Sequence, residues 1–190
     1  MLNNFQVARH LKSKNISSVI RLSSGFTLTE VLAVVSILTI MGAFTVPHWF
    51  SYLHTYTLNT AQDQAFQLIR QTQNDAKRLH TLQQVSFREL NGRVQGATHP
   101  ANRVPTTSEW QNFPEGAHID IHETTFATNG DTYKLQFDQE GNANGQLGRL
   151  VLVHQAGGQT RRCVVVSTLI GLVRKASNRA TPDQSGRTCY

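Results

Sequence analysis

The sequence of 190 residues lacks the motifs that mark most hydrolases and nucleotide-binding enzymes. It contains no Gly-x-Ser-x-Gly, His-Glu-x-x-His, phosphate-binding loop or Gly-x-Gly-x-x-Gly pattern, which would supply a nucleophile, a metal site or a cradle for phosphate. His118 and His122 are four residues apart, but in a strand they would lie about 13 Å from each other, too far for one metal ion. We therefore expect no enzymatic activity, no metal site and no cofactor.

Acidic residues are absent from residues 1–25, where four basic side chains give a charge of +4. The remaining residues hold 14 basic and 12 acidic side chains, so only +2 of the total of +6 belongs to them. The pI of about 9.7 is therefore largely a property of the N-terminal segment. With 39% hydrophobic residues, the rest of the chain can build a modest core.

A long apolar run follows the basic segment. It extends for 21 residues from Phe26 to Val46, of which 14 are apolar, and about 20 are needed to span a bilayer. Positive charge ahead of the run predicts a cytoplasmic N-terminus and a body on the other side of the membrane. The alternative is a cleavable secretory signal, but its apolar core would be shorter and no Ala-x-Ala-like site precedes Pro47. Glu30 lies within the run, where an ionisable group normally needs a partner.

Beyond the run, apolar or small side chains recur every three or four residues, which is typical of an amphipathic helix. They are Leu58, Ala61, Ala65, Leu68, Thr72, Ala76 and Leu79. We expect one continuous helix over about 26–80, whose second half, 48–80, packs on a sheet. Polar residues between these positions, such as Gln62 and Arg70, are expected to face away from it.

After residue 80 the hydrophobic period changes to two, so residues 81–190 are expected to form a β-rich domain. The expected strands are 84–88, 118–126, 132–138, 149–155, 161–168 and 171–175. Asn91-Gly92 and Asn129-Gly130 indicate tight hairpin turns, which favour a mostly antiparallel sheet. Residues 95–116 contain three prolines and are expected to form a long loop. The fold class is therefore α+β.

The string Gly25-Phe26-Thr27-Leu28-Thr29-Glu30 resembles the class III signal of type IV pilins and type II secretion pseudopilins. The resemblance implies that a prepilin peptidase cleaves after Gly25, leaves 1–25 as the leader and methylates Phe26. It also implies that Glu30 serves assembly, because its carboxylate would pair with the Phe26 amine of a neighbouring subunit. Thr29 departs from the family pattern, in which an aliphatic residue is commoner. The implied architecture is the pilin fold, with 26–47 as the membrane half of the helix.

Patterns in the second half resemble the GspH/FimT group of minor pilins and pseudopilins. They are Leu135-Gln136-Phe137, Leu150-Val151-Leu152, Arg162-Cys163-Val164-Val165-Val166-Ser167 and Gly171-Leu172-Val173-Arg174. Members of this group sit at or near the tip of a type II secretion pseudopilus or a type IV pilus. The implied partners are other pilin subunits and the peptidase, with the inner membrane holding the precursor.

The C-terminal region holds the two cysteines, Cys163 and Cys189, which are 26 residues apart and outside any Cys-x-x-Cys pair. In a body outside the cytoplasm they would form one disulfide that ties the tail to a late strand, and the alternative is two unrelated thiols.

Charge separates in this half of the chain. Residues 109–148 carry seven acids and one lysine, whereas 149–190 carry seven basic residues and one acid. The acids lack calcium-loop spacing and are expected to form a solvated face.

A basic patch of Arg174, Lys175, Arg179 and Arg187 would bind DNA through phosphates, as some FimT members do with a Gly-Arg-x-Arg motif. Here the first arginine of that motif is replaced by Leu172. Complementary packing of acidic and basic faces between subunits is the preferred alternative.

Overall fold

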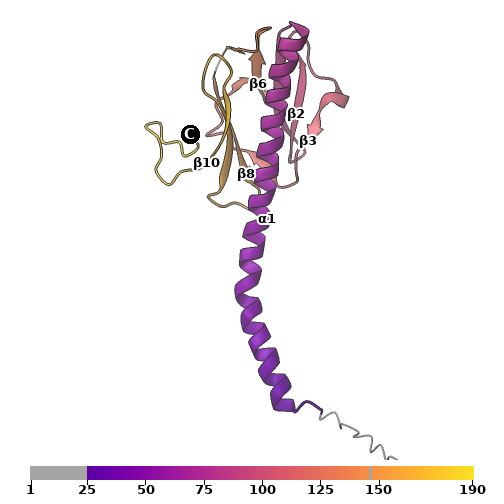
Figure 1. The fold of residues 1–190 in the computed structure, drawn as a ribbon, viewed down its shortest axis with the longest axis vertical. Helices are drawn as coiled ribbons and strands as arrows, with labels where there is room; N and C mark the ends of the chain where they lie inside the picture. The colour runs from indigo at the N-terminus through magenta and orange to yellow at the C-terminus, as the bar shows by residue number, and fades with distance from the viewer. Residues whose placement is uncertain (1–24, 146) are drawn as a thin grey trace, which may run out of the picture. The chain divides into compact units, whose positions relative to one another are not determined.

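The computed structural model describes residues 25–145 and 147–190, so the expected leader lies outside the described residues except for Gly25. The chain divides after Ala43 into two compact units, which are described separately. One helix, α1 (Leu28–Leu79), runs through this division. All strands of the described residues, and the short 3-10 helix η1 (Thr107–Glu109), belong to 44–190 (Figure 1).

The strands form two sheets in which every described pair is antiparallel. The six-stranded sheet has the order β3-β2-β1-β6-β5, with β7 also paired to β6. Its strands are β1 (Gln83–Leu90), β2 (Arg93–Pro100), β3 (Gln111–Asn112), β5 (Ala127–Asn129), β6 (Thr132–Phe137) and β7 (Ala143–Asn144). The four-stranded sheet, of order β10-β9-β8-β4, consists of β4 (Ala117–Ile119), β8 (Gly148–His154), β9 (Arg161–Val166) and β10 (Val173–Ser177).

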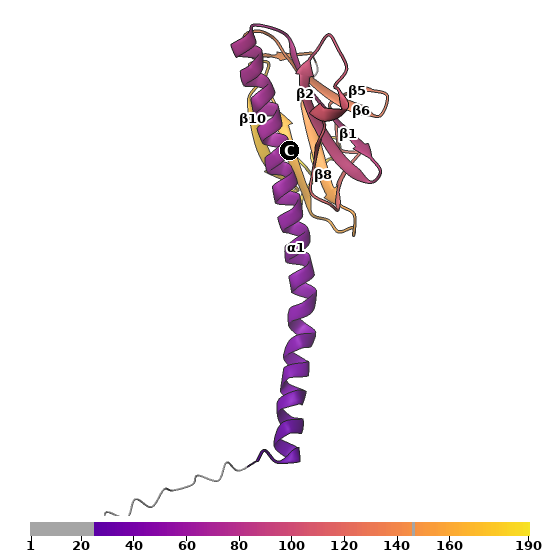
Figure 2. The ribbon, with the colours of Figure 1, turned by 90° about the vertical axis from the view of Figure 1, so that its right-hand side faces the viewer.

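Within residues 44–190, the C-terminal part of α1 packs along both sheets (Figures 1 and 2). The expected stripe faces the core from Leu58 to Ala76, where each of its members is at most 4% exposed, and it ends before Leu79, which is 51% exposed. Phe87 and Phe137 from one sheet and Leu150 and Val164 from the other complete the same core. The expected α+β class, a long N-terminal helix packed on antiparallel sheet, is confirmed.

The expected loop over 95–116 is wrong at its beginning and at Gln111–Asn112, which form β3 and pair with β2. The Asn91-Gly92 turn returns the chain at once, so β2 pairs with the whole of β1, from Leu90 opposite Arg93 to Gln83 opposite Pro100. The strand was hidden in the sequence because its inward positions include Gly96 and Thr98, which carry no large apolar side chain. Gly96 admits α1: a Cβ built on it would lie 2.7 Å from Leu68 Cδ1.

The strand expected over 118–126 is also too long, because β4 ends at Ile119. The Asp120 carboxylate accepts hydrogen bonds from the backbone N–H groups of His122 (3.0 Å) and Glu123 (3.3 Å), which turns the chain. An aspartate that bonds its own backbone two residues on is typical of turns rather than strands. His118 therefore lies in a strand and His122 in the turn that follows it.

Replacing Gly96 with valine is expected to destabilise the folded chain by about 1–3 kcal/mol, because the added methyl groups must displace Leu68 and the rings of Phe87 and Phe113. The free energy of unfolding, from chemical denaturation of the detergent-solubilised protein, measures this loss. Thr128→Val, at an exposed position of β5, is the matched control and should change stability little. Equal stability of the two variants would contradict the close approach.

Candidate functional site

Gly25 and Phe26, the expected processing residues, lie immediately before α1 and outside any helix or strand. Both are exposed, the Phe26 side chain at 78%, and no heavy atom of another described residue lies within 4 Å of a Cβ built on Gly25. The residues of the chain that the structure describes therefore do not cover the peptide bond between them. Processing at this bond remains a prediction.

The expected assembly residue Glu30 lies in the first turn of α1. Its backbone N–H donates to the Thr27 carbonyl oxygen (3.1 Å) and to Thr27 Oγ1 (3.3 Å), so Thr27 caps the helix. A carboxylate in the first turn is favoured by the helix dipole. Within 25–145 and 147–190, the Glu30 carboxylate has no hydrogen-bond or ion-pair partner and remains available to another chain.

The first part of α1 is apolar on all sides and exposed. Ten large apolar side chains between Leu28 and Phe44 are 46–77% exposed. The helix contains an 18-residue window with a mean hydropathy of 1.9, none of it buried, and is long and apolar enough to cross a membrane. A helix that is apolar all round is stable only in apolar surroundings.

Aromatic side chains continue the exposed surface of α1 beyond the apolar run. Trp49, Phe50, Tyr52 and Tyr56 are 55–63% exposed. Sequence analysis did not single them out, although Trp and Tyr at the end of an apolar span are typical of a membrane–water interface. Because these residues follow closely after the apolar run, the sequence could have indicated an interface here.

Two buried glutamines attach α1 to loops and strands of the body, and periodicity alone could not find them. Gln62 was expected to face away from the sheet, but it is 6% exposed. Its Nε2 donates to the carbonyl oxygens of Cys163 and Ala176, both at 2.7 Å. Gln73 Nε2 donates to the carbonyl oxygens of Gly141 (2.8 Å) and Gly171 (3.1 Å). A long amide can satisfy backbone carbonyls within an apolar contact, so its side chain need not face water.

A disulfide joins Cys163 in β9 to Cys189, with Cα atoms 6.2 Å apart. The same tail is held by the Glu123 carboxylate, which accepts hydrogen bonds from the backbone N–H groups of Thr188 (3.2 Å) and Cys189 (3.1 Å). Arg161 Nε lies 3.0 Å from an Asp120 oxygen and 3.6 Å from a Glu123 oxygen. The expectation of a solvated acidic face is therefore wrong at Asp120 and Glu123, which pair with basic and backbone groups of their own chain.

The four expected DNA-binding residues do not share one surface. Lys175 pairs with Asp63 of α1 at 2.7 Å and lies over the Phe66 ring, whereas Arg174, the preceding residue of β10, is registered with Val165 on the disulfide side of the sheet. Neighbouring residues of a strand point to opposite faces. Arg179 stacks on Tyr190, and the backbone N–H of Arg187 donates to Asp183 Oδ1 (2.9 Å), which is the main cause of the lowered pKa of Asp183.

Three histidines gather near the end of β8. The ring of His54 in α1 stacks on that of His154, with centroids 4.0 Å apart. His118 of β4 lies close enough for its charge to act on His154, and its Nδ1 is 2.7 Å from Glu89 Oε1. Burial first, and then the charges of His54 and His118, lower the pKa of His154.

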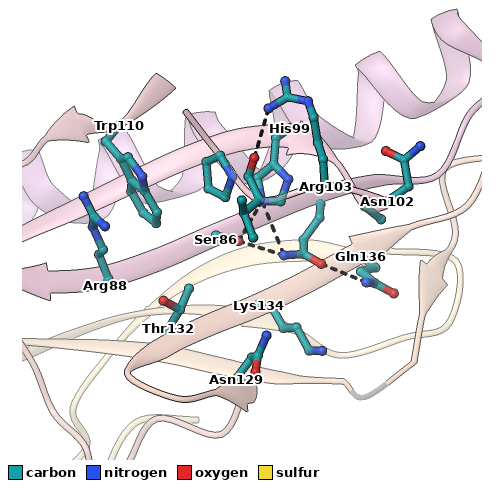
Figure 3. A pocket seen from close by; sticks show the side chains of 14 residues that line it. Ser86, Arg88, His99, Asn102, Arg103, Trp110, Asn129, Thr132, Lys134 and Gln136 are labelled. Atoms are coloured by element: carbon teal, nitrogen blue, oxygen red, sulfur yellow. Dashed lines mark hydrogen bonds between the residues drawn. The ribbon is translucent and has the colours of Figure 1, made fainter. Parts of the chain in front are cut away.

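A groove with many polar side chains in its lining lies on the six-stranded sheet, on the face away from α1 (Figure 3). It has a volume of about 690 Å³ and is lined by β1, β2, β5, β6 and the segment 101–110. Arg88 stacks on Trp110 at one end, 3.9 Å from its centroid, and Asn102 and Gln136 lie toward the other (Figure 3). This groove could not be predicted from the sequence, because its lining comes from four strands and a loop.

Neither a protein-family model nor a curated protein matches the sequence. Among solved structures, this chain is similar to the type IV minor pilin FimU of Pseudomonas aeruginosa strain PAO1. The TM-score is 0.46 and the sequence identity 8%, over 65% of this chain and 90% of that chain.

Replacing Gln62 with alanine is expected to lower the free energy of unfolding by about 1–3 kcal/mol, because two buried carbonyl contacts lose their donor. Gln67→Ala is the control, since Gln67 lies one turn along the same helix and is exposed. Chemical denaturation of both variants separates the lost contacts from the change in helix propensity. Equal effects at the two positions would contradict an anchoring role for Gln62.

Stability is expected to fall as pH drops below about 6.5. Because the folded state lowers the pKa of His154, the unfolded chain binds more protons in this range, so acid favours unfolding. Thermal unfolding between pH 7.5 and 5 measures the slope, which should be shallower in His154→Gln. His122→Gln, in the exposed turn, should retain the wild-type slope. Parallel slopes for all three proteins would exclude His154 as a source.

Proposed function

We propose that this chain is a subunit of a type IV pilin-like filament and that residues 26–47 hold it in the inner membrane until it assembles. One observation carries the proposal: the first part of α1 exposes apolar side chains on all sides, with a free carboxylate in its first turn. Lipid can surround such a helix before assembly, and the apolar helices of other subunits can surround it afterwards.

In this proposal a prepilin peptidase cleaves between Gly25 and Phe26 and methylates the new N-terminus. The amine of Phe26 is cationic near neutral pH. A carboxylate four residues along, in a neighbouring subunit, neutralises it in surroundings where an unpaired charge is costly. The exposure of the bond and the free Glu30 carboxylate support both steps. The pairing would set the stagger between adjacent helices.

The basic segment ahead of the helix supports a cytoplasmic N-terminus and a periplasmic body, residues 81–190 with the amphipathic half of the helix, 48–80. The sequence patterns quoted above favour the GspH/FimT group. We therefore assign the chain as a minor, tip-proximal subunit of a type II secretion pseudopilus or a type IV pilus. Its partners are other pilin subunits. No catalytic step is assigned to it.

DNA binding through the C-terminal basic residues is the weaker alternative. Lys175 is engaged by Asp63, and the alternation of β10 directs Arg174 to the other face. Arg179 and Arg187 lie in the tail held by the disulfide. No described contact brings the four side chains together as one phosphate-binding surface.

Glu30→Ala is expected to reduce recovery of the chain with partner pilin subunits at least tenfold, because the neighbouring amine would remain buried without a counter-charge. Co-purification from detergent-solubilised membranes of cells that carry the assembly machinery measures this. Glu140→Ala removes an exposed carboxylate of the body and serves as the control. Undiminished recovery of Glu30→Ala would overturn the assembly role of that carboxylate.

A further inference from the structure

The groove of Figure 3 carries positive charge that its own lining does not neutralise. Three cations line it, Arg88, Arg103 and Lys134, and no carboxylate does. Arg103 is paired with Glu109, which lies outside the lining, and its Nη1 donates to Glu109 Oε2 at 2.8 Å. The hydrogen bond from Arg103 is the largest cause that lowers the pKa of Glu109 to about 2. Arg88 donates to Gln95 Oε1 and stacks on Trp110. Lys134 is half-buried and has no ion-pair or hydrogen-bond partner in the described part of the chain. A ligand of this groove should therefore carry negative charge.

The same groove holds further hydrogen-bonding side chains. The side chains of Asn102, Asn129 and Thr132 line the groove and make no hydrogen bond to another described residue. An amide or a hydroxyl both donates and accepts. Phosphate and sulfate oxygens chiefly accept, so they would leave the amide oxygens unmatched. Hydroxyl groups on the ligand would satisfy both the donors and the acceptors.

The floor of the groove is a fixed polar network (dashed lines in Figure 3). Gln136 Nε2 donates to Gln84 Oε1 at 2.8 Å, and Gln84 Nε2 donates to Ser86 Oγ at 2.8 Å. His99 Nδ1 lies 2.8 Å from the Pro100 carbonyl oxygen, which can only accept, so His99 Nε2 accepts from the Ser86 hydroxyl at 2.9 Å. Ser86 and His99 are 1% and 2% exposed, so they support the lining and do not present a nucleophile.

Size and lining restrict the ligand further. About 690 Å³ is within the range of small-molecule sites, which are usually mostly apolar. Apolar atoms also contribute more of this groove's surface than polar atoms do, with Trp110 and the segment around Val104 as its apolar residues. A ligand with hydroxyls, an apolar face and a carboxylate matches such a site.

From these features we infer that the groove binds an acidic sugar, a hexuronate unit of an anionic oligosaccharide. Lys134 binds its carboxylate, and Asn129, Thr132 and Asn102 bind its hydroxyls. The edge of Trp110 contacts the C–H face of the ring. This site is formed by the body alone and does not depend on the proposed assembly role.

The test uses the full chain in detergent with Trp49→Phe, which leaves Trp110 as the one remaining tryptophan of the sequence. Its fluorescence is titrated with trigalacturonate, neutral galactotriose, inorganic phosphate and a tetraglutamate peptide at constant ionic strength. We expect saturable binding of trigalacturonate and at least tenfold weaker binding of the other three. Equal binding of phosphate or of the peptide would indicate a general anion surface and overturn the inference, as would no binding of trigalacturonate.

Variants then place the carboxylate. Lys134→Gln is expected to weaken trigalacturonate binding about tenfold or more while leaving galactotriose binding unchanged, because it removes one charged hydrogen bond. Arg174→Gln removes an exposed cation of the other sheet and should change neither. Full affinity in Lys134→Gln, or an equal loss in Arg174→Gln, would overturn the assignment.

Discussion

The exposed apolar surface of α1 is the constraint on which the rest of the molecule depends. Burying one large apolar side chain contributes about 1.5–3 kcal/mol. Ten such side chains between Leu28 and Phe44 are roughly half exposed, so covering them is worth on the order of 10 kcal/mol. That is comparable with the entire stability of a typical domain. The helix is also long and apolar enough to cross a membrane, where lipid would cover these side chains.

In the body, the constraint is different: one helix must pack closely against two sheets. Small residues on α1, such as Ala61 and Ala65, and Gly96 on β2 allow close approach. Buried amides then satisfy the backbone carbonyls that this approach encloses. Charged groups are also satisfied within the chain, since Arg161 pairs with Asp120 and Glu123 at the turn after β4. Arg161 thus joins the basic segment 149–190 to two of the seven acids of 109–148.

Sequence periodicity was sufficient for the elements with large apolar side chains. The helix, the hairpin turns and the strands of the second half followed from it, since Leu, Val and Phe positions repeat there. It failed at β2, where the inward residues Gly96 and Thr98 carry no large apolar side chain, and at 120–123, where a side-chain hydrogen bond of Asp120 determines the turn. It also missed Gln62 and the groove, because both depend on contacts between distant segments. Gly25, Phe26 and Glu30 were recognisable because they are consecutive or nearly so.

The two glutamines are also placed to share a load along α1, together with the other contacts between the helix and the body. Gln62 and Gln73 are 11 residues apart, which is about 16 Å along a helix. Each side-chain amide donates to two backbone carbonyl oxygens, so a force along α1 would act on these four hydrogen bonds in parallel rather than one after another. Bonds loaded in this shearing arrangement must yield together. Tension in the helix is therefore shared between two distant points of the body.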